Sequence, residues 1–124
     1  MFNDTKAFSG FSVNDVSACM QFYREVLGLD VEEQYPGFVI KTAGNNPILA
    51  YGKDDHQPAT FTILNFPVDD IDKAVDELTA KGVVFEHYDG VDEKGILRGR
   101  AQNMGPDIAW FKDPAGNVLS VLQS

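Results

Sequence analysis

Two histidines are the side chains best suited to acid–base chemistry in this sequence. His56 follows Asp54-Asp55, and His87 lies between Glu86 and Asp89. An imidazole has an unperturbed pKa of about 6.5, so either histidine could move a proton near neutral pH if it faced a cavity. Their spacing does not require them to meet. Both can equally be surface or rim histidines, and no catalytic residue is assigned from the sequence.

Two arginines are candidates for anion binding. Arg98 and Arg100 stand two residues apart on a possible strand, so both would point to one face and could clamp an anion. Salt bridges with the many acidic residues explain the pair equally well.

Aromatic and apolar side chains on predicted strands are the candidates for a small-molecule pocket. Alternation along a strand places Phe8 on one face with Gly10 and Ser12, opposite Phe11 and Val13. Apolar walls with a few polar anchors are typical of small-molecule sites, although core packing explains each residue equally well. The predicted ligand-binding residues are Phe8, Phe38, Phe61, Ile63, Asn65, Arg98, Arg100, Met104, Trp110 and Ser120.

The elements that must position these side chains form one unit that occurs twice. Val13-Asn14-Asp15-Val16 recurs 55 residues later as Val68-Asp69-Asp70-Ile71. Each copy predicts a strand that runs into a helix capped by an aspartate. Apolar residues at helical spacing continue to Gly28 in the first copy and to Gly82 in the second, where a glycine can end the helix.

The remaining strands follow from turn residues and apolar runs, and each repeat then has the order βαβββ. The first repeat (about 5–52) has strands at Lys6–Val13, Leu29–Gln34, Phe38–Thr42 and Pro47–Tyr51, with a turn at Ala43–Asn46. The second (about 60–123) follows a linker at 53–59 and has strands at Thr60–Val68, Val83–His87, Ile108–Lys112 and Asn117–Leu122. An insertion at about 88–106 includes a possible strand at Ile96–Ala101. We expect a single α+β domain over 1–124 whose two sheets curve around a shared cavity.

Composition and charge narrow the class of protein. The chain has 124 residues, 44% hydrophobic and 23% charged, with a formal net charge of −9. This acidic balance makes nucleic acid and anionic membranes poor partners. Cys19 is the only cysteine, so no intramolecular disulfide can form, and its place on an apolar helix face predicts a core role. We expect a cytoplasmic protein.

One motif resembles a known family. Residues 110–119 read WFKDPAGNVL, which is similar to the F-x-D-P-x-G-N hairpin of the vicinal-oxygen-chelate superfamily. That superfamily includes glyoxalase I, bleomycin-resistance proteins, fosfomycin-resistance enzymes and extradiol dioxygenases. The two repeated strand ends also fit its pattern. The resemblance implies a pair of βαβββ units that together bind a small organic molecule.

The resemblance also locates the positions at which metal-dependent members hold a divalent ion. These members typically use a histidine in the first strand of each unit and a carboxylate in each last strand. The matching positions here are Phe8 and Ile63 for the histidines, and Leu49 and Ser120 for the carboxylates. Because three of the four are apolar, we expect no metal and no cofactor.

The expected function is therefore that of a metal-free small-molecule-binding protein, acting as a homodimer. The resistance proteins that it resembles sequester a cationic antibiotic in acidic pockets, and the net charge is compatible with that. An alternative is a glyoxalase-like lyase, isomerase or glutathione-dependent transferase with a relocated metal or with an acid–base group such as His87 or Asp89. A third possibility is an accessory protein whose cavity is filled by its own side chains.

Overall fold

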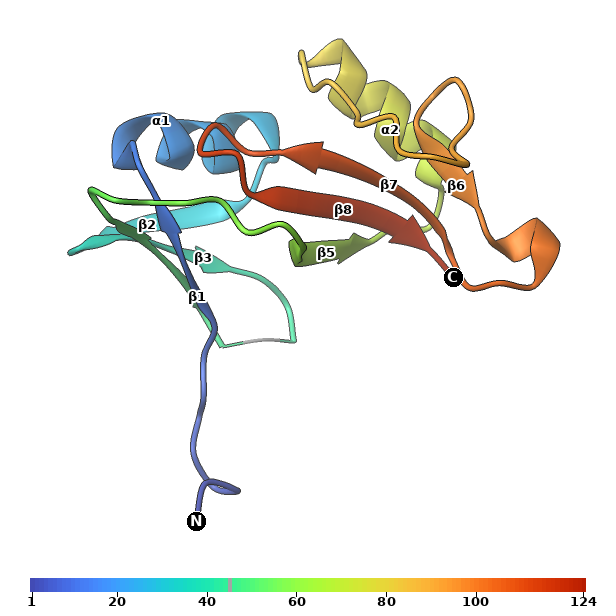
Figure 1. The fold of residues 1–124 in the computed structure, drawn as a ribbon. Helices are drawn as coiled ribbons and strands as arrows, with labels where there is room; N and C mark the ends of the chain where they lie inside the picture. The colour runs from blue at the N-terminus through green and yellow to red at the C-terminus, as the bar shows by residue number, and fades with distance from the viewer. Residues whose placement is uncertain (45) are drawn as a thin grey trace. The chain divides into compact units, whose positions relative to one another are not determined.

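The computed structural model describes residues 1–44 and 46–124 and divides the chain into unit 1 (Met1–Pro58) and unit 2 (Ala59–Ser124) (Figure 1). Asn45, part of the predicted turn Ala43–Asn46, lies outside the described residues. Each unit contains one four-stranded mixed sheet and helical segments in the order βαβββ. The predicted α+β fold of two repeats is confirmed, whereas a cavity shared by the two sheets stays a prediction.

Unit 1 begins with β1 (Gly10–Val13), which leads into α1 (Val16–Gln21) and a π-helical turn, η1 (Phe22–Val26). The Asp15 side chain caps α1 by accepting a hydrogen bond from the Ala18 N–H at 3.0 Å. The strands β2 (Asp30–Gln34), β3 (Gly37–Lys41) and β4 (Ile48–Gly52) complete a sheet of order β1-β4-β3-β2. Within it β1 and β4 are parallel, and the other pairs are antiparallel.

Unit 2 repeats this arrangement. β5 (Thr62–Pro67) leads into α2 (Ile71–Ala80), which Asp70 caps by accepting from the Lys73 N–H at 3.1 Å. β6 (Ile96–Arg98), a short 3₁₀ helix, η2 (Arg100–Gln102), β7 (Asp107–Lys112) and β8 (Val118–Gln123) follow. The sheet order β5-β8-β7-β6 matches that of unit 1. None of the helices in the described ranges has the length and apolar character needed to span a membrane.

The predicted strand at Val83–His87 is wrong. Val83 and Phe85 are buried and Val84 is exposed, which is the alternation of a strand, and the Glu86 N–H donates to the Trp110 carbonyl at 2.8 Å. No strand forms there, however, and the counterpart of β2 is β6. The segment read as an insertion therefore supplies a regular member of the repeat.

Two other strands differ from their predicted bounds by three residues or more. The possible strand Ile96–Ala101 ends at Arg98 because the chain turns at Gly99, where a Cβ would lie 2.6 Å from the Pro106 carbonyl oxygen. The first strand begins at Gly10 instead of Lys6, although the Ser9 carbonyl already accepts from the Leu49 N–H at 3.0 Å.

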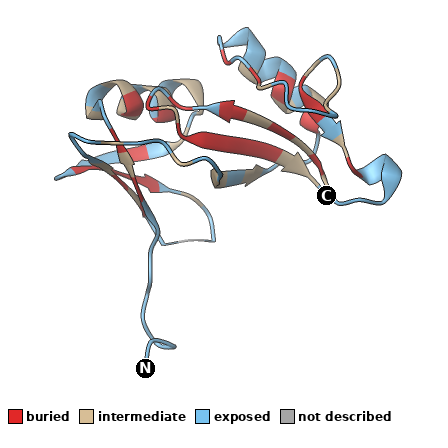
Figure 2. Cartoon of the chain, viewed as in Figure 1, coloured by how far each residue is buried: buried red, intermediate tan, exposed pale blue. Residues whose placement is uncertain are grey.

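Aromatic residues form the core of each unit on the side of its helix. In unit 1 the Tyr23 ring lies 5.9 Å from Phe11 and 5.8 Å from Phe38, and Cys19 is fully buried beside them on α1, as predicted. In unit 2 the rings of Phe85 and Phe111 are 5.5 Å apart. Figure 2 shows buried positions running along β7 and β8, and exposed positions on α2.

The D-P-x-G-N motif builds the turn between β7 and β8. Asp113 Oδ1 accepts hydrogen bonds from the N–H groups of Ala115 and Asn117, both at 2.9 Å. Asp113 Oδ2 accepts from Asn117 Nδ2 at 3.1 Å, and both side chains are buried. The motif that resembles the family thus stabilises this turn, and the side-chain polar atoms of Asp113 and Asn117 form hydrogen bonds within it.

Substitution of Gly37 tests the close approach of β3 to β4 in the unit 1 sheet. A Cβ at Gly37 would lie 2.0 Å from the Ala50 carbonyl oxygen, so Gly37→Ala must displace a strand, and we expect a loss of at least about 2 kcal/mol. Gly10→Ala is the matched control, because its Cβ would lie 3.4 Å from the Leu49 oxygen. Urea denaturation of both variants measures the difference. Equal losses would contradict this explanation.

Candidate functional site

The pleat of the unit 1 sheet decides which side chains are available for a site. Phe38 contacts Tyr23 on the side of the helical segments, so Ile40 also faces that side. The intervening Val39 points the other way. Residues paired with Val39 across the sheet, and those two positions further along each strand, share its face. The helix-distal face of unit 1 therefore comprises Gly10, Ser12, Val39, Leu49 and Tyr51. Phe38, predicted to bind ligand, is fully buried against Tyr23 and belongs to the core.

A cavity of about 340 Å³ lies on the helix-distal face of unit 1, near the start of β1. Its walls are apolar, and polar groups border them. The lining residues are Lys6, Phe8, Gln34, Val39, Asn46, Pro47 and Leu49. Phe8, a predicted ligand-binding residue, is 65% exposed here. The volume is within the range of about 300–1,000 Å³ that is usual for small-molecule sites.

A serine and a histidine meet on the same face. Ser12 Oγ lies 2.6 Å from His56 Nδ1, and the direction of this hydrogen bond depends on the histidine tautomer. The linker returns to the sheet because the Lys53 N–H donates to the Val13 carbonyl at 3.0 Å and the His56 N–H donates to Lys53 at 3.1 Å. Alternation indicated the face of Ser12, but no local signal in the linker identified its partner.

In unit 2 a glutamine identifies the face that α2 covers. Gln123 Oε1 accepts from the Ile71 N–H, the first of α2, at 3.0 Å. Leu119 and Val121 share the face of Gln123. The opposite, helix-distal face of unit 2 comprises Asn65, Ile108, Trp110, Ser120 and Leu122.

Three predicted ligand-binding residues meet on the helix-distal face of unit 2. Ser120 is fully buried and donates from Oγ to Asn65 Oδ1 at 2.6 Å. Trp110 is the register partner of Ser120 and is half-buried. Its ring centroid lies 5.4 Å from that of Tyr88, a contact that the sequence did not reveal.

Other predicted residues do not join this group. The register between β5 and β8 shifts between Thr62 and Leu64, so the alternation assumed for Phe61, Ile63 and Asn65 does not continue through the strand. Phe61 is 68% exposed, and Ile63 is half-buried at the shift. Met104 follows η2 and is 76% exposed.

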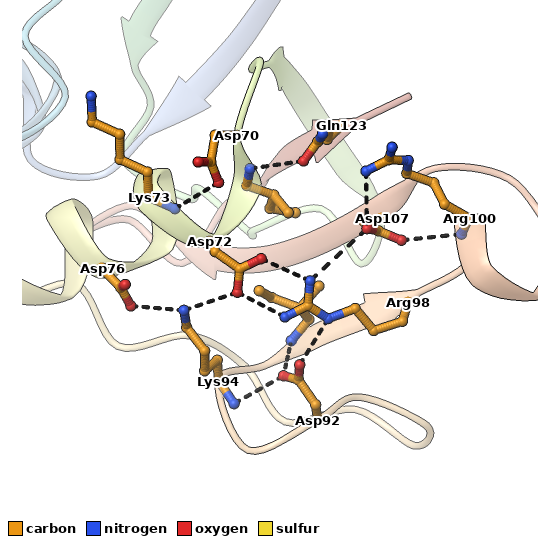
Figure 3. Close-up of polar contacts among 12 residues, drawn as sticks. Asp70, Asp72, Lys73, Asp76, Asp92, Lys94, Arg98, Arg100, Asp107 and Gln123 are labelled. Carbon is orange, nitrogen blue, oxygen red and sulfur yellow. Dashed lines mark hydrogen bonds and ion pairs between the residues drawn. The ribbon is translucent and has the colours of Figure 1, made fainter.

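Arg98 binds carboxylates of its own unit on the side of α2 (Figure 3). Its Nη1 and Nη2 donate to the two oxygens of Asp72, on α2, at 2.9 and 2.8 Å. Its Nε donates to Asp92 at 3.0 Å. Lys94 joins the network through Asp72 and Asp76, at 3.0 and 2.9 Å. We call these five residues the α2 ion-pair network.

Arg100 does not complete an anion clamp with Arg98. Arg100 lies in η2, where its N–H donates to Asp107 Oδ1 at 3.1 Å and its guanidinium is 3.6 Å from Asp107 Oδ2. Of the two explanations that the sequence left open, the structure shows salt bridges. They connect β6 and η2 to α2 and β7.

A second cavity, of about 360 Å³, lies between α2 and the segment that follows it. Val75, Phe85 and His87 line it together with Glu93 and Lys94. His87 is exposed, lies in unit 2, and is therefore on a different unit from His56.

The positions of the family's metal ligands do not fit a divalent ion. Leu49 pairs with Gly10, and Ser120 pairs with Asn65, which lies 55 residues after Gly10. The two last-strand positions are therefore equivalent, and they hold an alkyl side chain and a hydroxyl that donates to Asn65. Phe8 and Ile63 offer no donor atoms. Among the described residues, no three His, Cys, Asp or Glu side chains gather into a group that could hold a metal.

Comparison with known proteins identifies the family. The model described as the Glyoxalase/Bleomycin resistance protein/Dioxygenase superfamily matches residues 8–121. The chain belongs to this superfamily, as its hairpin motif and repeated strand ends predicted. No curated protein matches it significantly.

Solved structures that share this fold have different activities. The fosfomycin resistance protein FosX from Listeria monocytogenes is 14% identical, with a TM-score of 0.70 over 98% of this chain and 93% of its own. TnmS3, an antibiotic binding protein from Streptomyces sp. CB03234, is 20% identical, with a TM-score of 0.66 over 99% and 98%. Lactoylglutathione lyase from Agrobacterium tumefaciens is 22% identical, with a TM-score of 0.65 over 98% and 94%. These similarities show the fold alone.

The α2 ion-pair network predicts a dependence of stability on pH. Hydrogen bonds from Arg98, and then from Lys94, hold the pKa of Asp72 well below its usual value of about 3.9. This carboxylate therefore stabilises the fold above pH 4, and the contribution is lost as the pH falls toward the lowered pKa. Because Asp72 and Arg98 are both partly exposed, we expect Asp72→Asn to cost only about 1 kcal/mol at pH 7.

Urea denaturation of wild type and Asp72→Asn from pH 7 to pH 2.5 tests this prediction, and the difference should narrow below pH 4. Asp69→Asn removes the same charge from an exposed residue next to the helix cap and is the control. The losses from Asp72→Asn and Arg98→Met should also be less than additive in the double variant. A pH-independent difference, or full additivity, would contradict the assignment.

Proposed function

We propose that the protein binds a small organic molecule on its helix-distal faces and does so without a metal ion. The observation that carries the proposal is the cavity of about 340 Å³ on unit 1. Its wall includes Phe8 and Leu49, which stand at two of the positions where metal-dependent family members have a metal ligand, and both are apolar here. An apolar wall favours burial of a hydrocarbon or aromatic group by about 25 cal/mol per Å² of surface removed from water.

The helix-distal face of unit 2 offers a further candidate surface for a ligand. Trp110 and Tyr88 offer aromatic surface, and Asn65 and Ser120 offer an amide and a hydroxyl. Such a combination is usual in small-molecule pockets. An antibiotic-binding protein of the same fold supports binding without chemistry as a function for this architecture.

The protein is proposed to act in the cytoplasm as a homodimer. The single cysteine, buried on α1, supports a reducing compartment, because the fold requires no disulfide. The dimer follows from the resemblance to the resistance proteins. Light scattering coupled to gel filtration, at micromolar concentration, gives the mass directly, and a monomer would remove this part of the proposal.

An enzymatic alternative is favoured by one observation, the contact between Ser12 and His56. A hydroxyl and an imidazole at 2.6 Å can exchange a proton with each other and with a bound molecule. An isomerase or lyase using this pair would need no metal. Turnover of a bound compound that is lost in His56→Gln, with binding retained, would establish this alternative.

Filling the unit 1 cavity tests the proposed site. Leu49→Trp places a large ring among Phe8 and Val39, so we expect the affinity for 4-phenyl-1-butanol, a neutral probe, to fall at least about tenfold. Val84→Trp, in the cavity beside α2, is the control and should leave the affinity unchanged. Titration calorimetry measures both. Loss of affinity in the control alone would place the probe in the other cavity.

Trp110 reports on unit 2. As the only tryptophan, it makes fluorescence a direct readout of this face when a ligand binds. We expect Trp110→Ala to weaken ligand binding more than it lowers the free energy of unfolding, because the ring is only half-buried. Calorimetry and urea denaturation give the two quantities. Equal losses would make Trp110 a residue of the core.

Metal independence is tested on the purified, untagged protein. We expect elemental analysis to find no stoichiometric ion and Ni²⁺, Zn²⁺, Mn²⁺ and Fe²⁺ to leave the melting temperature unchanged, because an ion bound to the native state would raise it. A near-stoichiometric ion, or a large shift with one metal, would overturn the metal-free proposal and favour the lyase or dioxygenase class.

A further inference from the structure

We infer that the ligand of the unit 1 site is an apolar carboxylate, whose charged group is bound by Lys6. This inference rests on the proposed function and specifies its ligand class. The lining of the cavity divides into an apolar part, with Phe8, Val39 and Leu49, and a polar part. The polar part contains one ammonium group and two amides, from Lys6, Gln34 and Asn46, and no carboxylate.

The position of Lys6 is set by hydrogen bonds of the residues that follow it in the chain. Asn46 Nδ2 donates to the Ala7 carbonyl at 2.6 Å, and the Leu49 N–H donates to the Ser9 carbonyl at 3.0 Å. These bonds hold the segment before β1 against the start of β4 and the residues before it. The ammonium group of Lys6 is thereby kept at the border of the cavity.

The charge of Lys6 has no ion-pair partner among the residues that the structure describes. Glu32, the register partner of Val39, is an acidic residue of this face. Its carboxylate is bound to Lys41, which lowers the pKa of Glu32, and Asp30 is the register partner of Lys41. Lys6 is therefore the charge left for a ligand.

A single ammonium group favours a singly charged anion. One lysine is a point charge with three donors, whereas a phosphate dianion is usually met by an arginine or by several cations. The amides of Gln34 and Asn46 can each donate to a carboxylate oxygen. The apolar wall requires the rest of the ligand to be a hydrocarbon or aromatic group.

The net charge of −9 does not decide the ligand's sign. Charges more than about 8 Å apart are largely screened at physiological ionic strength, so the groups in contact with a ligand dominate its binding. In this cavity those groups are cationic or neutral. The contacts therefore favour an anion although the whole chain would attract cations.

Three probes of one skeleton test the inference: 4-phenylbutyrate, 4-phenyl-1-butanol and 4-phenylbutylamine. By titration calorimetry at low salt we expect the carboxylate to bind about three- to tenfold more tightly than the alcohol, and the amine to bind most weakly. Lys6→Met should remove the advantage of the carboxylate and leave the affinity for the alcohol unchanged. Lys6→Arg should retain it. Lys73→Met, which makes the same change of charge on α2, should have no effect.

The outcomes separate this inference from the proposed function. If the amine binds as tightly as the carboxylate, or Lys73→Met acts like Lys6→Met, the anion site is overturned while the cavity remains a binding site. If Leu49→Trp leaves the affinity for all three probes unchanged, the binding site lies elsewhere. If no probe binds the wild-type protein, both the inference and the proposed function fail.

Discussion

The pleat of the two sheets is the constraint on which the rest of the structure depends. Successive side chains of a strand point to opposite faces of the sheet. One contact with a helix therefore determines which face each neighbouring residue of the strand occupies. In unit 1 the contact of Phe38 with Tyr23 leaves Val39 and its register partner Leu49 on the other face. In unit 2 the bond from Ile71 to Gln123 does the same for Ser120. The helix side of each sheet thus holds an aromatic core, and the helix-distal faces carry a mixed set of aromatic, apolar and polar side chains that can bind a ligand.

A group of charged residues in unit 2 also lies on the helix side of its sheet. Asp72, Asp76 and Asp92 are acidic residues of unit 2 that bind Arg98 or Lys94 on the side of α2. These ion pairs connect β6, through Arg98, and the loop before it, through Lys94, to α2. Because the net charge of −9 already counts Arg98 and Lys94, these three carboxylates and two cations contribute only −1 to it. This is why the chemistry of a site has to be taken from the residues that line it.

The sequence predicted the local features of the fold correctly. Features that depend on residues a few positions apart are all present. They are the repeat, the aspartate caps at Asp15 and Asp70, and the hairpin at Asp113. Features that depend on distant partners were missed. The segment 83–87 has the alternation of a strand, yet β7 pairs with β6 instead, and alternation alone cannot choose between two such partners. Phe38, expected to bind ligand, lies in the core against Tyr23, a contact between distant parts of the chain.

The candidate site was predictable in part. Alternation from the helix cap placed Phe8 and Ser12 on one face, and the family pattern brought Ser120 to attention. Lys6 was not identified as a binding residue, and His56 was named without its partner Ser12, because each lies in an irregular segment whose path is fixed by bonds to β4 or β1. Arg98 was ambiguous, because an arginine in an acidic chain can bind either a ligand or a neighbour.

The choice between a binding protein and an enzyme depends on how far a ligand reaches along β1. The cavity lies at the Gly10 and Leu49 end of the helix-distal face, whereas His56 contacts Ser12, two residues further on. Two residues of a strand span about 7 Å, roughly the length of one aromatic ring with a short chain. A ligand confined to the cavity would meet only apolar groups, amides and Lys6, which bind without moving a proton. A longer ligand would place its far end beside Ser12 and His56, where a proton can be transferred. Binding is therefore the function that the cavity alone supports, and catalysis requires a molecule that extends along the sheet.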